Sequence, residues 1–246
     1  MNKLFSSNYP IVNLYKRSSS KSEIVTQMIY GESFRIDSKS SKWMKIKIKE
    51  DGYVGYIKRR KFIPYLKSTH KVSTLSANIY KKPNFKNKIG SLPYVAKIKV
   101  DKINSKFAMF QNKWIEIKNI KPLKYKNKDV FKDIKIFKGV KYKWGGKTFK
   151  GIDCSALVQV CLNFNNKFCP RDSSQQKKFL KKNIDLKKIK KNDIIYWKGH
   201  VALALSSKQL IHAYGPLKKT LVANIPQTIE RIKKTANLDI VSVKRI

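Results

Sequence analysis

The stretch GGKTFKGIDCSALVQV, residues 145–160, joins a glycine-bearing loop to an apolar run that follows a cysteine. Asp153 is a residue type that caps helices, because its carboxylate accepts hydrogen bonds from first-turn amides. The stretch therefore predicts a helix whose first turn contains Cys154, after glycines that would let the backbone approach a substrate. Four apolar residues recur at the spacing of one helix face: Leu157, Val160, Cys161 and Phe164.

The three cysteines of the chain differ in where this predicted helix places them. Cys154 lies at the open helix end, where free amides and the helix dipole favour a negative charge. A thiol there, beside an imidazolium, can have its pKa lowered from ~8.5 into the range ~3.5–7.5. Cys154 is therefore a candidate nucleophile, with a packed thiol as the alternative. Cys161, inside the helix, and Cys169, before Pro170, are interpreted as packed residues.

A cysteine nucleophile needs a base, and the base needs an orienting group. Residues 194–215 contain two apolar runs around Ser206-Ser207-Lys208, a pattern that predicts a hairpin. In a hairpin centred near Ser206, His200 and His212 would be cross-strand neighbours on one face. The spacing predicts a histidine pair, with two unrelated structural histidines as the alternative. His70 is expected to be exposed in a linker.

The first half of the chain repeats itself loosely, which predicts two small β-barrels. Residues 44–48 alternate apolar side chains with lysines, as in a half-buried strand. Asp51-Gly52 follows and predicts a hairpin turn. The repeated motifs are Asn-Leu-Tyr-Lys at 13–16 against Asn-Ile-Tyr-Lys at 78–81, and Lys-Trp-Met-Lys-Ile-Lys at 42–47 against Lys-Trp-Ile-Glu-Ile-Lys at 113–118.

The formal net charge of +41 comes overwhelmingly from lysine, since only seven of the 56 basic residues are arginine. Attraction to a polyanion is one interpretation of this charge. The other is a composition-biased, soluble surface, which we favour because the lysines are scattered through every segment. We therefore expect no specific nucleic-acid partner.

Composition also limits the location and the chemistry of the protein. No run of ~18 apolar residues is present, so no membrane-spanning helix is expected. The N-terminus shows no secretory signal, and three closely spaced cysteines do not suggest a disulfide framework, which together predict a cytoplasmic protein over a periplasmic or extracellular one. The His and Cys spacing does not suit zinc, so neither a metal nor another cofactor is expected.

The segment from about residue 130 to residue 246 resembles the NlpC/P60 cysteine peptidases, which have a circularly permuted papain-like fold. The matching stretches are YKWGGKTFKGIDCSALVQ (142–159), CPRDSSQQ (169–176), KKNDIIYWKGHVALAL (190–205) and LIHAYGP (210–216). The first half resembles tandem bacterial SH3-like domains, which usually bind cell-wall material or shape a neighbouring catalytic site; inert packing domains are the alternative. The expected fold class is α+β, with SH3-like domains at 1–66 and 67–124 and a peptidase domain at 125–246.

This resemblance implies a role for each matching residue. Cys154 would be the nucleophile, His200 the general base, and His212 the polar residue that orients the first imidazole. For Arg171, a salt bridge within the domain is the alternative to a substrate contact. The residues that would line the oxyanion region or contact the substrate are Tyr142, Asp153, Ser155 and Arg171.

The resemblance also implies a substrate. Such peptidases act on bacterial cell-wall stem peptides, and those with SH3-like domains often cut between γ-D-glutamate and a diamino acid, mainly meso-diaminopimelate. A muropeptide with a free N-terminal L-alanine is the expected substrate, in peptidoglycan recycling or turnover. An amidase or acyltransferase on the same scaffold and a non-catalytic cell-wall-binding protein are the alternatives.

Overall fold

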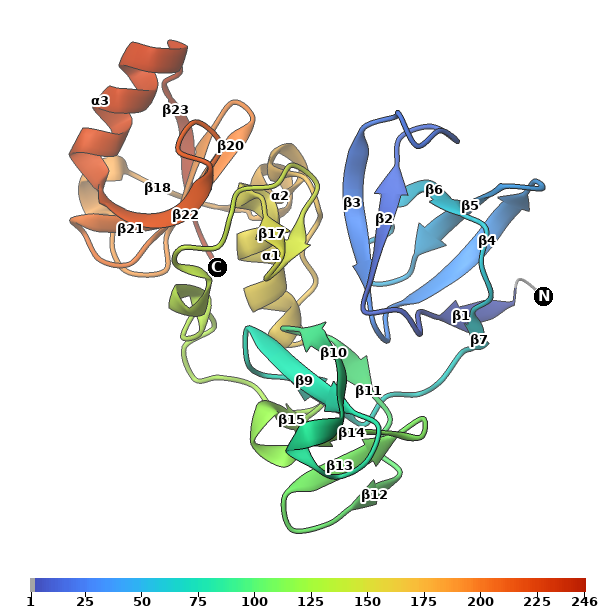
Figure 1. Ribbon diagram of the computed structural model, residues 1–246. Helices are drawn as coiled ribbons and strands as arrows, with labels where there is room; N and C mark the ends of the chain where they lie inside the picture. The colour runs from blue at the N-terminus through green and yellow to red at the C-terminus, as the bar shows by residue number, and fades with distance from the viewer. Residues whose placement is uncertain (1–2) are drawn as a thin grey trace. The chain divides into compact units, whose positions relative to one another are not determined.

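The computed structural model describes residues 3–246 and is built mainly from strands, with three α-helices among the described residues (Figure 1). Its contacts divide the chain into two compact units. One unit runs to Lys126 and includes Phe164–Asn166, and the other comprises Asn127–Asn163 and Lys167–Ile246. No helix within residues 3–246 is long and apolar enough to cross a membrane.

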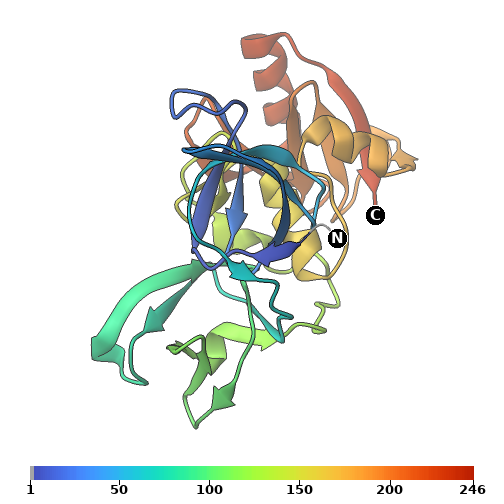
Figure 2. The same cartoon turned by 90° about the vertical axis from the view of Figure 1, so that its right-hand side faces the viewer.

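The first unit begins with a seven-stranded antiparallel sheet in the order β3-β2-β6-β5-β4-β1-β7, strongly bent in Figure 2. In β5, Met44, Ile46 and Ile48 are buried while the intervening lysines are not, which confirms the predicted alternation. Gly52 has φ +73° and ends the predicted turn between β5 and β6. The strands are β1 (Leu4–Ser6), β2 (Ile11–Tyr15), β3 (Ile24–Ile29), β4 (Ser33–Lys39), β5 (Trp43–Ile48), β6 (Val54–Lys58) and β7 (Ile63–Pro64).

Two further sheets follow, in the orders β10-β9-β14-β13-β12 and β11-β8-β15. Here β9 pairs directly with β14, whereas β6 separates β2 from β5 in the first sheet, so the second copy of the repeat is not a full duplicate. His70 begins β8 and is half-buried, which corrects its prediction as an exposed linker residue. The strands are β8 (His70–Val72), β9 (Ser76–Tyr80), β10 (Lys88–Pro93), β11 (Lys97–Ile98), β12 (Lys102–Ile103), β13 (Phe107–Phe110), β14 (Lys113–Glu116) and β15 (Ile120–Pro122), with 3-10 helices at Phe85–Asn87 and Ile117–Asn119.

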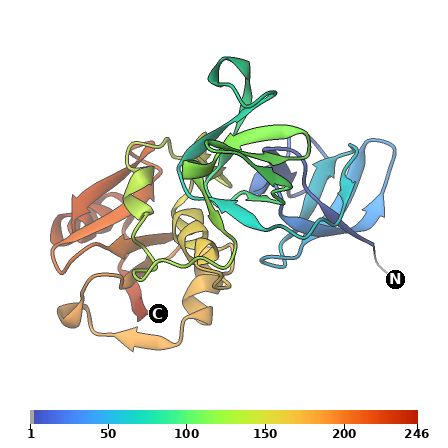
Figure 3. The same ribbon diagram turned by 90° about the horizontal axis from the view of Figure 1, so that it is seen from below.

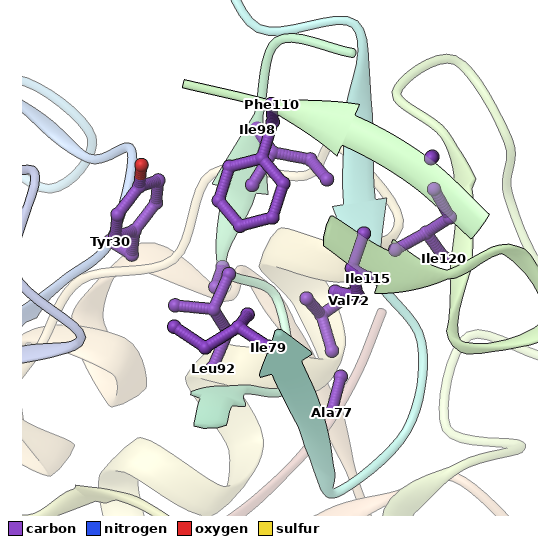
Figure 4. Packing of buried hydrophobic residues seen from close by; sticks show 11 residues of the cluster. Tyr30, Val72, Ala77, Ile79, Leu92, Ile98, Phe110, Ile115 and Ile120 are labelled. Carbon is purple, nitrogen blue, oxygen red and sulfur yellow. The ribbon is translucent and has the colours of Figure 1, made fainter. Parts of the chain in front are cut away.

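Tyr30 follows the third strand of the first sheet and packs into the apolar core of the two sheets that come next in the chain (Figure 4). Its ring meets Phe110 edge-on at 5.8 Å between centroids, and its hydroxyl bonds the side chain of Gln111. Gly31 follows with φ +79°, and a Cβ there would lie 2.0 Å from the carbonyl oxygen of Lys97. Only glycine fits this approach, so the two parts of the unit are packed closely together.

The second unit is organised around a six-stranded antiparallel sheet in the order β18-β23-β19-β20-β21-β22. Helix α3 lies against it, with Ile225 and Ile232 packed among sheet residues such as Trp197 and Leu210 (Figure 1 and Figure 3). The elements are β16 (Lys147–Thr148), β17 (Gly151–Ile152), α1 (Cys154–Phe164), α2 (Ser173–Phe179), β18 (Lys182–Ile184), β19 (Ile194–Trp197), β20 (His200–Ala204), β21 (Gln209–Tyr214), β22 (Lys219–Asn224), α3 (Ile225–Ala236) and β23 (Ile240–Arg245), with 3-10 helices at Ile134–Phe137 and Leu186–Lys188.

Helix α1 starts at Cys154 as predicted, but it has no exposed polar face over its first turns. Besides the predicted stripe, Ala156, Val158, Gln159 and Leu162 are each at most 2% exposed. The prediction of one apolar face was therefore too narrow, because the helix is enclosed on every side. Cys161 and Cys169 are buried and not joined in a disulfide, which confirms their prediction as packed residues.

Candidate active site

Asp153 caps α1, as predicted. Its Oδ1 accepts the backbone N–H of Ala156 at 2.8 Å, and its Oδ2 accepts that of Gly145 at 3.0 Å. The same carboxylate therefore holds both the helix start and the loop before it. Within that loop, a Cβ on Gly146 would lie 2.5 Å from the carbonyl oxygen of Gly151. The close approach at Gly146 is thus to the protein's own backbone, whereas the predicted approach of this loop to a substrate stays a prediction.

A buried ion pair stabilises this capped end. Arg171, 1% exposed, donates from Nη1 to Asp153 Oδ1 at 3.0 Å and from Nη2 to Asp153 Oδ2 at 2.5 Å. Nη1 also donates to the hydroxyl of Ser155 at 2.9 Å, and that hydroxyl donates to Asp153 Oδ1 at 3.1 Å. The geometry therefore favours the salt-bridge alternative for Arg171, and it places Asp153 and Ser155 in the same buried network.

Gln176 belongs to this network and was given no role by the sequence analysis. It is fully buried, and its Nε2 donates to the carbonyl oxygens of Ser155 and Pro170, each at 2.9 Å. It thereby ties the first turn of α1 to the segment that carries Arg171. The signal available in the sequence was its position at the end of the matching stretch 169–176.

The thiol of Cys154 lies at the N-terminus of α1 and is 6% exposed. It accepts hydrogen bonds from the backbone amides of Val201 and Ser155. Because Val201 directly follows His200, the structure brings the candidate nucleophile to the start of the strand that carries the candidate base.

His200 and His212 form a direct pair, with Nε2 of His200 2.9 Å from Nδ1 of His212. Among the described residues, Nδ1 of His200 has no hydrogen-bond partner. For Nδ1 to accept a proton, the neutral ring must carry its proton on Nε2 and donate it to Nδ1 of His212. His212 is then a neutral acceptor with its own proton on Nε2, an atom that is buried.

The register of the hairpin differs from the prediction, because each cross-strand partner is shifted by two positions. Leu203 pairs with Ile211 and Ala204 with Leu210, so the hairpin is centred at Ser207, one residue beyond the predicted centre. Continued along the strands, this register sets His200 and His212 diagonally on one face. Diagonal neighbours are within reach of aromatic side chains, which is why the imidazoles still meet.

Burial shifts the pKa values of Cys154, His200 and His212. It raises the pKa of the Cys154 thiol to about 12, and the charge of Asp153 adds to the rise, while amide hydrogen bonds and Arg171 oppose it. This direction is opposite to the lowered pKa predicted from the helix end alone. Burial also lowers the pKa of His200 to about 4, and burial together with the charges of His200 and Arg231 lowers that of His212 to about 3. These shifts favour the neutral thiol and the neutral imidazoles over an ion pair.

Tyr142 lies close enough to Cys154 to interact with it electrostatically. Burial raises the pKa of its hydroxyl, and the charges of Cys154 and Asp153 add to this rise. Its backbone forms a bridge with Ile152, two residues before the thiol, which fixes its place. The predicted oxyanion role remains a prediction. The described residues contain no cluster of three or more His, Cys, Asp or Glu side chains placed to hold a metal ion.

Comparison with protein families matches two segments of this chain. Residues 139–231 match the NlpC/P60 family, and residues 14–62 match the bacterial dipeptidyl-peptidase SH3 domain. The first match contains the capped helix and both histidines, and the second lies within the first sheet. The chain thus carries an NlpC/P60 domain and a bacterial SH3 domain.

The curated relatives that match this chain carry the names of peptidases. Dipeptidyl-peptidase 6 of Lysinibacillus sphaericus is 38% identical over 29% of this chain and 27% of its own length. The probable endopeptidase NlpC homologue of Haemophilus influenzae is 34% identical over 30% of this chain and 42% of its own length. The γ-D-glutamyl-L-lysine dipeptidyl-peptidase of Bacillus subtilis is 23% identical over 84% of this chain and 77% of its own length. The chain therefore matches less than half of the first two relatives.

Two solved structures share the fold over nearly the whole chain. An NlpC/P60 family protein from Bacillus cereus has a TM-score of 0.82 and 18% identity, covering 99% of both chains. An NlpC/P60 endopeptidase from Photobacterium damselae has a TM-score of 0.66 and 13% identity, covering 98% of this chain and 70% of that one. The fold is therefore that of NlpC/P60 proteins.

Proposed function

Because the chain carries an NlpC/P60 domain together with a bacterial SH3 domain, we propose that it is a cysteine peptidase of bacterial cell-wall stem peptides. The proposed scissile bond joins γ-D-glutamate to meso-diaminopimelate in muropeptides with a free N-terminal L-alanine, released in peptidoglycan recycling or turnover. A relative named for the γ-D-glutamyl-L-lysine bond supports this bond class. The observation that carries the proposal is the contact between Nε2 of His200 and Nδ1 of His212 beside the capped thiol.

In the proposed mechanism, the proton of Cys154 moves to Nδ1 of His200 as sulfur attacks the amide carbonyl carbon. Proton transfer accompanies the attack because burial keeps both groups neutral at rest. Nε2–H of His200 stays donated to Nδ1 of His212, which stabilises the imidazolium that forms. The amides of Val201 and Ser155, which already bond the sulfur, stabilise negative charge as it develops there.

The tetrahedral oxyanion then collapses and the C–N bond breaks. Nδ1–H of His200 protonates the leaving amine, which departs as the new N-terminus of the diamino acid. Water next gives a proton to the same nitrogen and attacks the thioester carbon, so the carboxylate product leaves and the Cys154 thiol re-forms. Tyr142 is the proposed donor in the oxyanion region, since it lies within electrostatic reach of the thiol.

The proposal includes a domain arrangement with SH3-like barrels at 1–66 and 67–124 and a circularly permuted papain-like domain at 125–246. Separate sheets within 4–64 and 70–122 support the first two boundaries. The order of a nucleophile on α1 before a base on β20 is the order of papain-like enzymes and supports a papain-like third domain, while the permutation rests on the resemblance alone.

Incubation with L-Ala-γ-D-Glu-meso-diaminopimelate, followed by mass spectrometry, tests the proposal. The wild type is expected to release free meso-diaminopimelate, and Cys154→Ala to release none. Cys161→Ala, in the same helix and fully buried, is the matched control and should still cleave. Equal cleavage by Cys154→Ala would contradict the proposal. Turnover of other amides or esters without peptide cleavage would favour an amidase or acyltransferase, and cell-wall binding without hydrolysis a binding protein.

A further inference from the structure

The first sheet carries a groove of about 450 Å³ that the proposed peptidase chemistry does not use. Residues of strands β1, β4 and β5 and of the segment after β6 line it. Every lining residue belongs to the first unit of the chain, whereas Cys154, His200 and His212 belong to the second. The groove therefore contains none of the proposed catalytic residues.

The floor of the groove is apolar, with Phe5, Ile36, Met44 and Phe62 in its lining. The two phenylalanines are fixed by neighbouring rings. Phe62 meets Phe34 edge-on at 4.7 Å between centroids, and Phe5 stacks on Phe34 at 5.8 Å. A floor held in this way can receive an apolar body without much loss of side-chain entropy.

The rest of the lining is cationic: Lys39, Arg59, Arg60 and Lys61, with no acidic residue. Lysine at the surface of this chain carries little information, because it is abundant in every segment. Two adjacent arginines in this groove are a more specific sign of an anion-binding site, because the chain has only seven arginines. The planar guanidinium group matches the oxygens of phosphate and carboxylate groups in a way that an ammonium group does not.

Both arginines are oriented by the protein. The guanidinium of Arg60 lies over the ring of Tyr9 at 4.8 Å, and Nη1 of Arg59 donates to the carbonyl oxygen of Ser40 at 3.2 Å. Nε of Arg60 is buried and has no hydrogen-bond partner among the described residues.

We propose that this groove binds an amphipathic phosphate monoester. The phosphate would accept hydrogen bonds from Arg59 and Arg60, and its apolar body would lie on Phe5 and Phe62. A phosphate monoester is favoured over a carboxylate because its charge near −2 at neutral pH meets several cations at once. The four cations match the charge of the phosphate, and the apolar floor matches the hydrocarbon body of such a ligand.

Isothermal titration at low salt with octyl phosphate, below its micelle concentration, tests this site. One saturable site per chain is expected. Inorganic phosphate, which lacks the tail, octyl glucoside, which lacks the charge, and octanoate, which has a single charge, should each bind about tenfold or more weakly. Equal binding of octyl glucoside or octanoate, or no binding of octyl phosphate, would overturn the proposal.

Substitutions test whether octyl phosphate binds in this groove. Arg59→Gln with Arg60→Gln should weaken octyl phosphate binding about tenfold or more. Arg17→Gln with Arg35→Gln removes the same charge from residues outside the groove lining and should leave binding unchanged. Should the first double variant fail to fold, Lys39→Gln with Lys61→Gln changes two exposed lining residues and should also weaken binding. Wild-type affinity in either groove variant would show that the groove is not the site.

Discussion

Nε2 of His200 lies 2.9 Å from Nδ1 of His212, although the hairpin register sets the two residues diagonally on one face. The contact uses Nε2 of His200 and leaves Nδ1 for the proposed proton exchange with the Cys154 thiol. In the proposed mechanism each ring nitrogen of His200 therefore has a separate role.

Two substitutions of His212 test whether this residue orients the imidazole of His200 or only fills space. His212→Leu removes the acceptor for Nε2–H of His200, so kcat/KM should fall roughly a hundredfold or more. His212→Asn keeps an acceptor at the position of Nδ1 and should recover most of that loss. The measurement is tripeptide cleavage, with circular dichroism as the check on folding. Equal activity in the two variants would indicate that His212 only fills space.

The pH dependence of cleavage follows from the lowered pKa of the half-buried His200, the proposed base. Since burial lowers the pKa of His200 to about 4, protonation should halve kcat/KM only near that pH. The raised pKa of Cys154, about 12, predicts no alkaline loss up to about pH 9. Initial rates from pH 4 to 9 in constant ionic strength check this plateau. Loss of half the activity near pH 6.5 would mean that His200 titrates as an exposed imidazole.

Folding stability should decrease as the solution is acidified, through His212. This side chain is 1% exposed, and its pKa is lowered to about 3 in the folded chain, against ~6.5 when unfolded. Above pH ~6.5 both states are neutral. Below it the unfolded chain binds a proton that the folded chain excludes, which lowers the free energy of unfolding by up to ~1.4 kcal/mol per pH unit until the folded pKa is reached.

Urea titrations at pH 7.0, 6.0 and 5.0 measure this slope, in a window where carboxylates of ordinary pKa stay ionised. His212→Asn, which cannot be protonated, should have a shallower slope than the wild type. An unchanged slope in the variant would assign the acid sensitivity to other groups.

Removal of Arg171 should destabilise the peptidase domain strongly. Arg171→Met leaves the carboxylate of Asp153 buried and unpaired, at a cost of about 3–5 kcal/mol in the free energy of unfolding. Lys233→Met, which breaks the exposed ion pair with Asp239, is the matched control and should cost under about 1 kcal/mol. Adding Asp153→Asn to Arg171→Met should restore part of the loss, because asparagine still caps α1. Chemical denaturation measures all four chains.

Much of the fold could be predicted from local patterns. The alternation in residues 44–48 predicted a strand with its lysines outward, and Asp153 before an apolar run predicted the start of α1. These succeed because propensity and periodicity depend on neighbours along the chain. The second half of the repeat was predicted less well, since its pairing of β9 with β14 depends on which strands meet in space.

The sequence by itself determined which residues could carry the chemistry: a cysteine at a helix start and two histidines twelve positions apart. Only the tertiary structure decided how they are paired, because a one-residue shift of the hairpin centre changes every cross-strand partner. It also decided the direction of the pKa shifts. The helix end favours a thiolate, but enclosure of Cys154 by the packed domain opposes it more strongly, and burial is a property of the assembled fold and not of any local pattern.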